Sequence, residues 1–428
     1  MFIYRLCHLP CMSDVIMSIG AVVFFIVFAT LLFTFILFLL SFFSRDPRYP
    51  EYLPKISVVI PVYNEAKNVR SCLHALRSST YPHGRVQIIV VDDGSTDATC
   101  AIVKQFSNIM LVHQNHKGKV HALNKGIAHA TGEIVVTIDG DTIVESSFLE
   151  EIIKPFSDAH VGATSGAVMV MKETKGILGA FQHVEYLINN LNRRCFSRVF
   201  KTGILFFGSL AAYRRQALLE AGGFKPDTLA EDWDIVLEIK RQGYKIINIT
   251  SAKGYTAVPG SLSVLLAQRV RWWIGGMQAL KKNRALMKEK NFVIWYTFVT
   301  YGWWALYAII SLPLIIYQIA YWMPEGGIMT LFLYFFRWFT MFGPLYVMYK
   351  LPVWGLNMYS IFGVLSGIFT LLITFTALFY YRASFHIRNF IFSFLFIFLY
   401  FPYILLLNLF ITYAIFRSFF LEQKFFVK

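Results

Sequence analysis

The 428-residue sequence has few charged residues and few cysteines. Only 15% of its residues are charged, whereas 56% are hydrophobic and 42 are Phe. Because soluble domains carry about 25% charged residues, this composition excludes a wholly soluble protein and indicates one embedded in a membrane. The cysteines are odd in number and match no metal-ligand spacing, which favours reduced thiols without a catalytic role. They are Cys7, Cys11, Cys72, Cys100 and Cys195.

Acidic residues are also scarce, with 25 Asp and Glu against 40 Lys and Arg, so the net charge is +15. Such an excess can indicate nucleic-acid binding. The largest basic clusters, however, flank apolar segments, at residues 45–55 and 281–290. Attraction to anionic lipid explains that placement. We therefore expect a lipid bilayer as partner and no nucleic acid.

The apolar residues gather in segments long enough to cross a bilayer, which takes roughly 20 residues. The first runs from Val15 to Phe43 and is too long for a cleaved signal peptide, so residues 1–44 are expected to be a retained anchor. Further candidates lie within residues 292–418, where we expect three to four transmembrane helices because the segment around Arg337 can instead lie along the interface. They are Phe292–Met323, Gly327–Tyr349, Pro352–Tyr381 and Asn389–Phe416.

Residues 55–290 differ from their surroundings, with ordinary polarity and an alternation of strand and helix patterns. Basic residues at both borders place this domain in the cytoplasm by the positive-inside rule. The sequence thus predicts a multi-pass integral protein of the plasma membrane with a cytoplasmic catalytic domain.

The first half of this domain reads as strands separated by helices. Strands are expected at "KISVVIPVY", "VQIIVVDD" and "EIVVTI", and helices at "EAKNVRSCLHALRS", "TDATCAIVKQF" and "KVHALNKGIAHA". Such alternation predicts a parallel sheet with helices on both faces, which binds ligands beyond the carboxyl ends of its strands. Three polar clusters follow these strands: "PVYNE" (61–65), "VDDGSTD" (91–97) and "TIDGDT" (137–142).

Asp139 and Asp141 stand two apart with only Gly140 between them. Residues at this spacing in an extended segment point the same way, so both carboxylates can converge on one ion. With no His or Cys nearby, they suit a hard cation, Mg²⁺ or Mn²⁺. An ordinary Asp-rich turn is the alternative, but the position at a third acidic strand end favours the metal site.

Five motifs in order resemble the membrane-integrated family 2 glycosyltransferases. They are "PVYNE", "VDDGSTD", "DGDT", "EDWD" (231–234) and "QRVRW" (268–272). The group includes synthases of cellulose, chitin, hyaluronan and poly-N-acetylglucosamine, and ceramide glucosyltransferase. The resemblance covers about residues 55–280 and the general membrane layout.

The resemblance implies an α/β GT-A (Rossmann-like) catalytic domain inserted between transmembrane helices, a UDP-sugar donor, a divalent metal and inversion at the anomeric carbon. Tyr63, Glu65 and Asp93 would hold uracil and ribose. Asp139 and Asp141 would lie at the diphosphate, with Asp141 the more direct metal ligand. Lys119 would face the nucleotide or its phosphates. The alternatives are that Lys119 is an ordinary solvated helix residue and that Tyr63 serves only in packing.

Glu231 and Asp232 precede a helical pattern, so they stand at a helix N-terminus. A carboxylate there is often a cap. An attacking sugar hydroxyl, however, needs a general base within hydrogen-bond reach. The family often reads Thr-Glu-Asp, and Ala230 replaces the Thr here. The resemblance makes Asp232 the base, with Glu231 in support.

Gln268, Arg271 and Trp272 match the family's QxxRW motif. Arg271 offers a planar fork suited to pyrophosphate, and Trp272 a face on which an acceptor sugar can stack. An amphipathic interfacial helix is the alternative, and both readings are compatible.

"FFGSLAAYRRQAL" (206–218) resembles the family segment that lines the acceptor site, which makes Gly208, Ser209 and Arg214 candidate acceptor-side residues.

The sequence therefore predicts a membrane glycosyltransferase that adds sugar from UDP-N-acetylglucosamine to a growing β-linked polysaccharide and passes the chain through its C-terminal helices. A glycolipid transferase that adds a single sugar shares every motif and remains the alternative. Accessory export proteins are an open class of partner.

Overall fold

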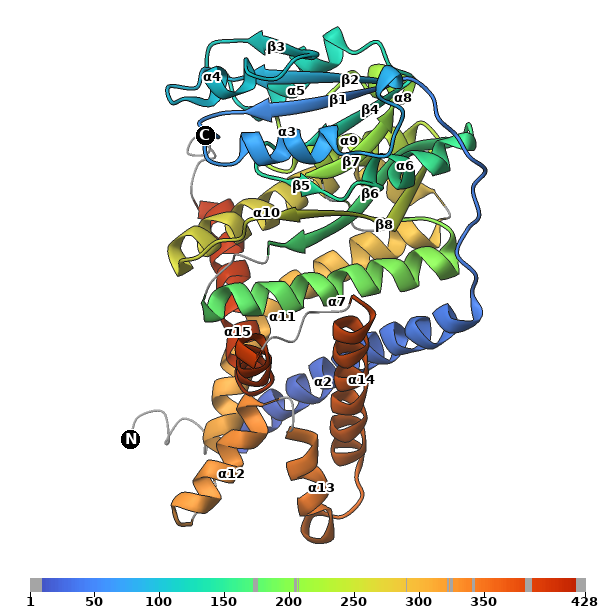
Figure 1. The fold of residues 1–428 in the computed structure, drawn as a ribbon. Coiled ribbons are helices and arrows are strands. Elements are labelled where there is room, and N and C mark those ends of the chain that lie inside the picture. The colour runs from blue at the N-terminus through green and yellow to red at the C-terminus, as the bar shows by residue number, and fades with distance from the viewer. Residues whose placement is uncertain are drawn as a thin grey trace.

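The computed structural model describes residues 10–171, 176–203, 206, 208–289, 291–321, 323, 326–340, 343–381 and 387–420. A sheet with helices on both faces forms the upper part of the molecule in Figure 1, and long apolar helices form the lower part. Two helices, α7 (Ile177–Phe200) and α10 (Leu262–Lys282), run between the sheet and the apolar helices.

The described residues form one eight-stranded sheet in the order β3-β2-β1-β4-β7-β6-β8-β5. The strands are β1 (Ile56–Val62), β2 (Val86–Asp92), β3 (Ile109–His113), β4 (Ile134–Ile138), β5 (Ile143–Val144), β6 (Val161–Val170), β7 (Leu210–Arg214) and β8 (Lys245–Thr256). Strands β3, β2, β1 and β4 are parallel, and β7 runs antiparallel to both β4 and β6. The expected parallel sheet is therefore only half of a mixed one.

The helices that accompany the sheet are α3 (Val69–Arg77), α4 (Thr99–Val103), α5 (Lys119–His129), α6 (Phe148–Ile153), α8 (Arg215–Glu220) and α9 (Glu231–Arg241), with short 3₁₀ helices η1 (His83–Arg85), η2 (Lys154–Ser157) and η3 (Arg284–Lys288). Both sheet faces are covered, as alternation along β1 shows: Val58 and Ile60 belong to one buried cluster, and Val59 belongs to the other. A strand buried on both faces is apolar at nearly every position, and β1 departs from this only at Ser57, whose hydroxyl donates to Gln87 Oε1 at 2.6 Å.

The membrane-type helices are α2 (Pro10–Phe43), α11 (Phe292–Tyr321), α12 (Ile328–Phe339), α13 (Gly343–Trp354), α14 (Met358–Tyr380) and α15 (Ile387–Phe420). Among the described residues, three segments are long and apolar enough to cross a bilayer: Ser18–Phe43, Phe292–Tyr317 and Ser360–Tyr380. Ile328–Arg337 and Pro402–Ser418 are shorter apolar helices. The expected span Gly327–Tyr349 is divided between α12 and α13, so it is not one continuous helix.

Ion pairs join the catalytic domain to the apolar helices. Asp46, just after α2, accepts a hydrogen bond from Arg194 at 2.9 Å and forms an ion pair with Arg198 at 3.1 Å; both arginines are on α7. The Arg194 guanidinium also lies 4.5 Å from the ring centroid of Tyr380, at the end of α14. Helix α7, which the sequence did not reveal as a separate element, thus connects α2 and α14 to the sheet.

Candidate active site

Charged residues from three distant parts of the chain meet beyond the carboxyl end of β4. Asp139 directly follows β4, Lys119 is the first residue of α5, and Glu231 and Asp232 form the first turn of α9. These side chains line one small pocket, which completes its wall with Leu123, Thr137, Gly208, Tyr213 and Phe224. The pocket brings together the predicted catalytic pair, one residue of the DGD motif and the predicted phosphate-facing lysine.

Lys119 links two of the acidic motifs. Its Nζ lies 2.7 Å from Asp139 Oδ1 and 3.5 Å from Glu231 Oε1. Burial disfavours the ammonium form, but the charges of Asp139 and Glu231 outweigh it and raise the pKa of Lys119. Lys119 is therefore positively charged in the pocket. Its side chain is 39% exposed, so it is both partly solvated and ion-paired, and its contact with a nucleotide stays a prediction.

Asp232 is held by two backbone donors. Gly208 N donates to Oδ2 and Trp233 N donates to Oδ1, each at 2.8 Å. Burial and the neighbouring Glu231 carboxylate raise the pKa of Asp232, against the opposing effects of Lys119 and of these two hydrogen bonds. A carboxylate with a raised pKa accepts protons more readily near neutral pH, which suits a general base.

Gly208 approaches Asp232 too closely for any other residue. A Cβ atom at position 208 would lie 2.3 Å from Asp232 Cβ and 2.5 Å from its Oδ2. Thr137 holds this glycine from the strand side by donating to its carbonyl oxygen at 3.3 Å. Gly208 thus belongs to the site because it supports Asp232, which differs from the acceptor contact expected from sequence.

The DGD motif faces the PVYNE segment. A Cβ at Gly140 would lie 2.9 Å from Val62 Cγ1 and 3.4 Å from Glu65 Cγ, so the glycine permits this close packing. Burial and the Asp139 charge raise the pKa of Asp141. Burial likewise raises the pKa of Glu65, and the Asp141 and Asp139 charges add to it. Three oxygen-bearing side chains therefore crowd together here and repel one another.

The last acidic residue of the EDWD motif, Asp234, has a structural role. Asp234 is buried and accepts from Lys282 Nζ at 2.7 Å and Asn283 Nδ2 at 3.0 Å. These partners lie at the end of α10, so Asp234 fixes α9 against α10. A role as catalytic base is excluded by this occupied, buried position.

The QxxRW residues lie on α10. Trp272 is partly exposed and covers Arg269, whose guanidinium carbon is 4.6 Å from the ring centroid. The structure gives Arg271 no ion pair or hydrogen bond among the described residues, and the Gln268 side-chain oxygen is buried without a partner there. Their contacts with donor and acceptor stay predictions.

A charged pair that the sequence did not reveal lies beside this motif. Arg269 donates to both carboxylate oxygens of Glu185 on α7, at 2.7 and 3.0 Å, and Tyr403 of α15 donates to the same carboxylate at 2.5 Å. The three residues border a cavity of about 310 Å³, which also contacts Asn189, Trp273 and Trp304. Separations of 84 and 218 positions hid this cluster.

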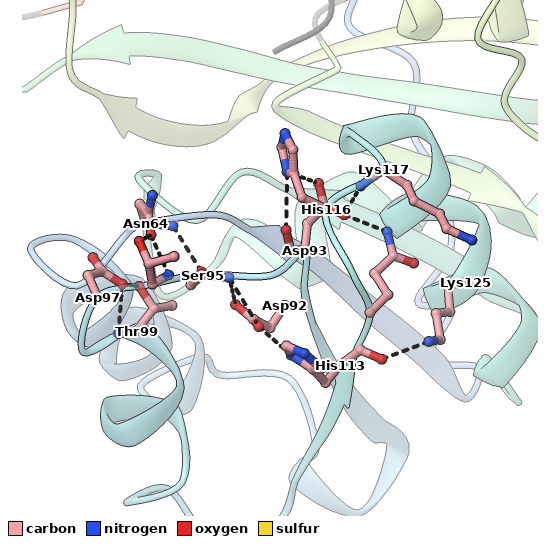
Figure 2. Close-up of polar contacts among 12 residues, drawn as sticks. Asn64, Asp92, Asp93, Ser95, Asp97, Thr99, His113, His116, Lys117 and Lys125 are labelled. Atoms are coloured by element: carbon pink, nitrogen blue, oxygen red, sulfur yellow. Dashed lines mark hydrogen bonds and ion pairs between the residues drawn. The ribbon is translucent and has the colours of Figure 1, made fainter.

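Hydrogen bonds join the PVYNE and VDDGSTD motifs to each other (Figure 2). Asn64 N donates to Ser95 Oγ at 2.9 Å, and Thr96 N donates to Asn64 Oδ1 at 2.9 Å. Asp93 is buried and accepts from Lys117 N at 2.9 Å and Gly118 N at 2.8 Å. Asp93 therefore orders the loop before α5, while its direct contact with a nucleotide stays a prediction.

Asp92, Cys100 and His113 form a second polar cluster, with their ligating atoms within 4.8 Å of one another. His113 Nδ1 and Asp92 Oδ2 lie 2.6 Å apart and Ser95 N donates to the same carboxylate. Two ligands of one tetrahedral Zn²⁺, at about 2.0–2.2 Å from it, would stand more than about 3 Å apart. The separation of Asp92 and His113 is therefore that of a hydrogen bond and not of two zinc ligands. These contacts stabilise the turn that follows β2.

Arg214 is not at the site, and the expectation that it lines the acceptor side is wrong. It pairs with Ile134, at the beginning of β4, whereas Asp139 follows the other end. Its guanidinium donates to the carbonyl oxygens of Val161 and Phe156 at 3.1 and 2.8 Å. Arg214 is the last of the five residues of β7, and Ser209 lies just before the first, beside Gly208 and the pocket.

The fold, with acidic side chains and a lysine gathered at the strand ends, is that of a GT-A glycosyltransferase. The mannosyltransferase PcManGT from Pyrobaculum calidifontis, solved with GDP-Man and Mn²⁺, superposes with a TM-score of 0.55. The match covers 83% of this chain and 98% of that one at 22% sequence identity, so it supports the fold. Residues 57–222 match the family model described as glycosyl transferase family 2, and the match lies within the catalytic domain.

Curated relatives agree with this assignment. The probable glycosyltransferase YdaM of Bacillus subtilis (strain 168) is 29% identical over 286 residues, which are 61% of this chain and 66% of that protein. The poly-beta-1,6-N-acetyl-D-glucosamine synthase of Staphylococcus aureus (strain COL) is 28% identical over 272 residues, 59% of this chain and 65% of that one. The chain thus matches just under two thirds of the length of these relatives.

Gly208→Ala should remove most of the transfer activity while the protein still folds. The new methyl group would displace the Asp232 carboxylate, and general-base catalysis contributes about 10²–10⁴ in rate. Initial rates of sugar transfer in detergent measure the loss. Gly260→Ala is the matched control, because a Cβ there meets nothing within 4 Å. Parent-like activity in Gly208→Ala would contradict the packing argument.

The pH profile should report Asp232. The ionised carboxylate is the active form, so the rate should be present above its raised pKa and fall as the pH is lowered through it. Glu231→Gln removes one cause of the upward shift, so the acidic limb of the profile should move to lower pH. The turnover number of both proteins measured from mildly acidic to neutral pH tests this. If the acidic limb stayed where it is, or moved to higher pH, the limb would report a group other than Asp232.

Proposed function

We propose that the protein is a membrane-bound, inverting glycosyltransferase that transfers N-acetylglucosamine from its UDP donor to a growing β-linked polysaccharide. The observation that carries this proposal is the pocket in which Asp232, Glu231, Lys119 and Asp139 meet beyond the carboxyl end of β4. The relative named as a poly-beta-1,6-N-acetyl-D-glucosamine synthase supports the choice of sugar.

In the proposed reaction, Asp232 accepts the proton of an acceptor hydroxyl as the hydroxyl oxygen attacks the anomeric carbon. The bond between that carbon and the diphosphate oxygen breaks, and UDP leaves with the electron pair. One displacement from the face opposite the leaving group inverts the anomeric configuration. Lys119 supplies positive charge close to the predicted diphosphate site, and Arg271 is the second cationic candidate.

A divalent metal fits the acidic cluster. Asp139, Asp141 and Glu65 offer only oxygen atoms. Burial, together with their mutual repulsion, raises the pKa values of Asp141 and Glu65, and a cation between them would relieve that repulsion. Oxygen-only ligands suit Mg²⁺ or Mn²⁺. Asp139 and Asp141 would hold the ion, which would neutralise charge on the leaving diphosphate.

The acceptor side is proposed at the cavity between α7, α10, α11 and α15. Trp273 and Trp304 offer aromatic faces for sugar rings, and Glu185, Asn189 and Arg269 offer hydrogen-bonding groups. The cavity borders both the catalytic domain and the apolar helices. The cavity therefore supports passage of the product from the active site into the membrane part. The catalytic domain is proposed to lie on the cytoplasmic side of the plasma membrane.

The function is tested with the full chain purified in detergent, UDP-N-acetylglucosamine and Mg²⁺ or Mn²⁺. We expect UDP release and a polymer whose length is measured by gel filtration and whose linkage is read with specific glycosidases. Asp232→Asn is the negative control. A single sugar added to a lipid would favour the glycolipid transferase, and a different preferred UDP-sugar would correct the donor. If no UDP-sugar led to UDP release, the proposal would be refuted.

Asp141→Asn should weaken both turnover and metal-dependent UDP binding, because it removes one anionic ligand. We expect UDP affinity to fall by at least about 10-fold with Mn²⁺ present and little without it. Calorimetric titration of UDP with and without metal measures the difference, and Glu220→Gln on α8 is the control carboxylate. Transfer that survives excess chelator would show that the metal assignment is wrong.

A further inference from the structure

One carboxylate joins three helices where the catalytic domain meets the apolar helices. Glu185 of α7 accepts two hydrogen bonds from Arg269 of α10, at 2.7 and 3.0 Å, and one from Tyr403 of α15, at 2.5 Å. Helix α15 packs against both α7 and α10 (Figure 1). Both oxygens of Glu185 therefore have donors within the protein, and the carboxylate is held in a fixed orientation between the helices.

The Glu185–Arg269 pair is largely shielded from water. The Glu185 side chain is 17% exposed and the Arg269 side chain is 9% exposed. Burial disfavours the guanidinium charge, but the Glu185 carboxylate outweighs that effect and raises the pKa of Arg269. Removing two charges from water costs about as much free energy as their attraction returns, so stability alone does not account for the pair.

The Arg269 guanidinium also lies over an aromatic ring. Its central carbon is 4.6 Å from the ring centroid of Trp272, which is a cation–π contact. The two residues stand three positions apart on α10 and so share one face of the helix. Arg269 occupies one face of the indole, and Trp272 remains 37% exposed. The angle of the ring therefore depends on the plane of the guanidinium, which the two hydrogen bonds to Glu185 fix.

Tyr186, the next residue along α7, relates this cluster to the acidic motifs. Burial raises the pKa of Tyr186 to about 12, the Arg269 charge opposes the shift, and the charges of Glu185 and Asp141 add to it. Because such effects weaken with distance, Tyr186 lies near both the DGD motif and the Glu185–Arg269 pair. The pair thus belongs to the same region of the molecule as the predicted reaction site.

We infer that Glu185 is a positioning residue for the acceptor: it fixes the Arg269 guanidinium, which sets the angle of the Trp272 indole on which the acceptor sugar is predicted to stack. This inference rests on the proposed function and adds to it a residue that the sequence did not reveal. Tyr403 connects the same carboxylate to α15, so a helix of the membrane part also helps to hold the ring.

The kinetic test uses the full-length protein in detergent with UDP-N-acetylglucosamine. The acceptor is an N-acetylglucosamine oligosaccharide with the beta-1,6 linkage named for the curated synthase. Glu185→Gln should raise the KM for the oligosaccharide about 10-fold, the factor that corresponds to about 1.4 kcal/mol. The KM for the donor should stay at the parent value, because Glu185 lies outside the predicted donor-binding residues.

Further variants separate geometry from charge. Arg269→Lys keeps the positive charge but lacks the planar fork, so it should raise the acceptor KM as Glu185→Gln does. Tyr403→Phe removes one hydrogen bond and leaves the ion pair, so it should cause a smaller rise in the same direction. Asp46→Asn is the matched control, because it breaks a different ion pair of α7 and should leave the acceptor KM unchanged.

A second readout follows the indole ring itself and needs no substrate. Protein labelled with fluorotryptophan gives a fluorine NMR signal for Trp272, which is identified by its loss in Trp272→Phe. That signal should shift in Glu185→Gln and in Arg269→Lys, because the guanidinium is no longer held against the ring, and it should stay unchanged in Asp46→Asn. Thermal unfolding in detergent checks that each variant is folded, and Arg269→Lys carries both readouts if Glu185→Gln does not fold.

The outcomes separate this inference from the proposed function. If the parent extends the oligosaccharide and Glu185→Gln does so with an unchanged acceptor KM, the inference is wrong and the proposed function stands. Equal rises in the donor and acceptor KM, or the same rise in Asp46→Asn, would show that Glu185 only anchors α7 and would also overturn it. If the parent extends no oligosaccharide, the proposed polysaccharide synthesis is wrong, and the Trp272 signal still decides whether Glu185 positions the ring.

Discussion

The electrostatic constraint on this structure is the concentration of carboxylates at one edge of its sheet. Asp139, Asp141, Glu65, Glu231 and Asp232 come from three separate motifs, and their mutual repulsion would oppose folding if nothing offset it. Lys119 offsets part of it by bridging Asp139 and Glu231. The excess negative charge that remains is suited to attract a divalent cation. Burial and the neighbouring Glu231 charge keep the Asp232 proton affinity high, so one arrangement serves both the proposed metal and the proposed base.

Such crowding is possible because glycines let backbones approach one another. Gly140 brings the DGD motif against Val62 and Glu65, and Gly208 brings a backbone N–H within 2.8 Å of Asp232. Neither glycine has a left-handed φ. Space, and not backbone freedom, therefore accounts for the residue type at these two positions.

Much of the parallel half of the sheet was predictable, because each of its strands is recognised from residues close together in the sequence. Apolar runs ending in "PVYNE", "VDDGSTD" and "TIDGDT" place β1, β2 and β4, and parallel strands bring their carboxyl ends to one edge. The antiparallel β7 was not predictable, since its pairing with β4 and β6 depends on residues far apart in the chain. This explains the error at Arg214: it lies at the far end of β7 from Ser209, and only the register against β4 tells which end lies at the site. The Glu185–Arg269 pair was hidden for the same reason.

The position of the catalytic helix connects the site to the membrane part. Helix α9 rests on α10 at Gly275 and Gly276: a Cβ at Gly275 would lie 2.5 Å from Ala230 N, and one at Gly276 would lie 2.3 Å from the Tyr301 hydroxyl oxygen. Tyr301, on α11, donates to the Trp273 carbonyl oxygen at 2.8 Å, and its ring lies 5.3 Å from that of Trp233. Asp234 fixes the same two helices from the other side through Lys282 and Asn283. The backbone beside Asp232 is therefore supported by a helix long and apolar enough to span a bilayer. Because side chains and backbone are closely packed between the two helices, a movement of α11 would also displace the first turn of α9, which carries the predicted catalytic pair.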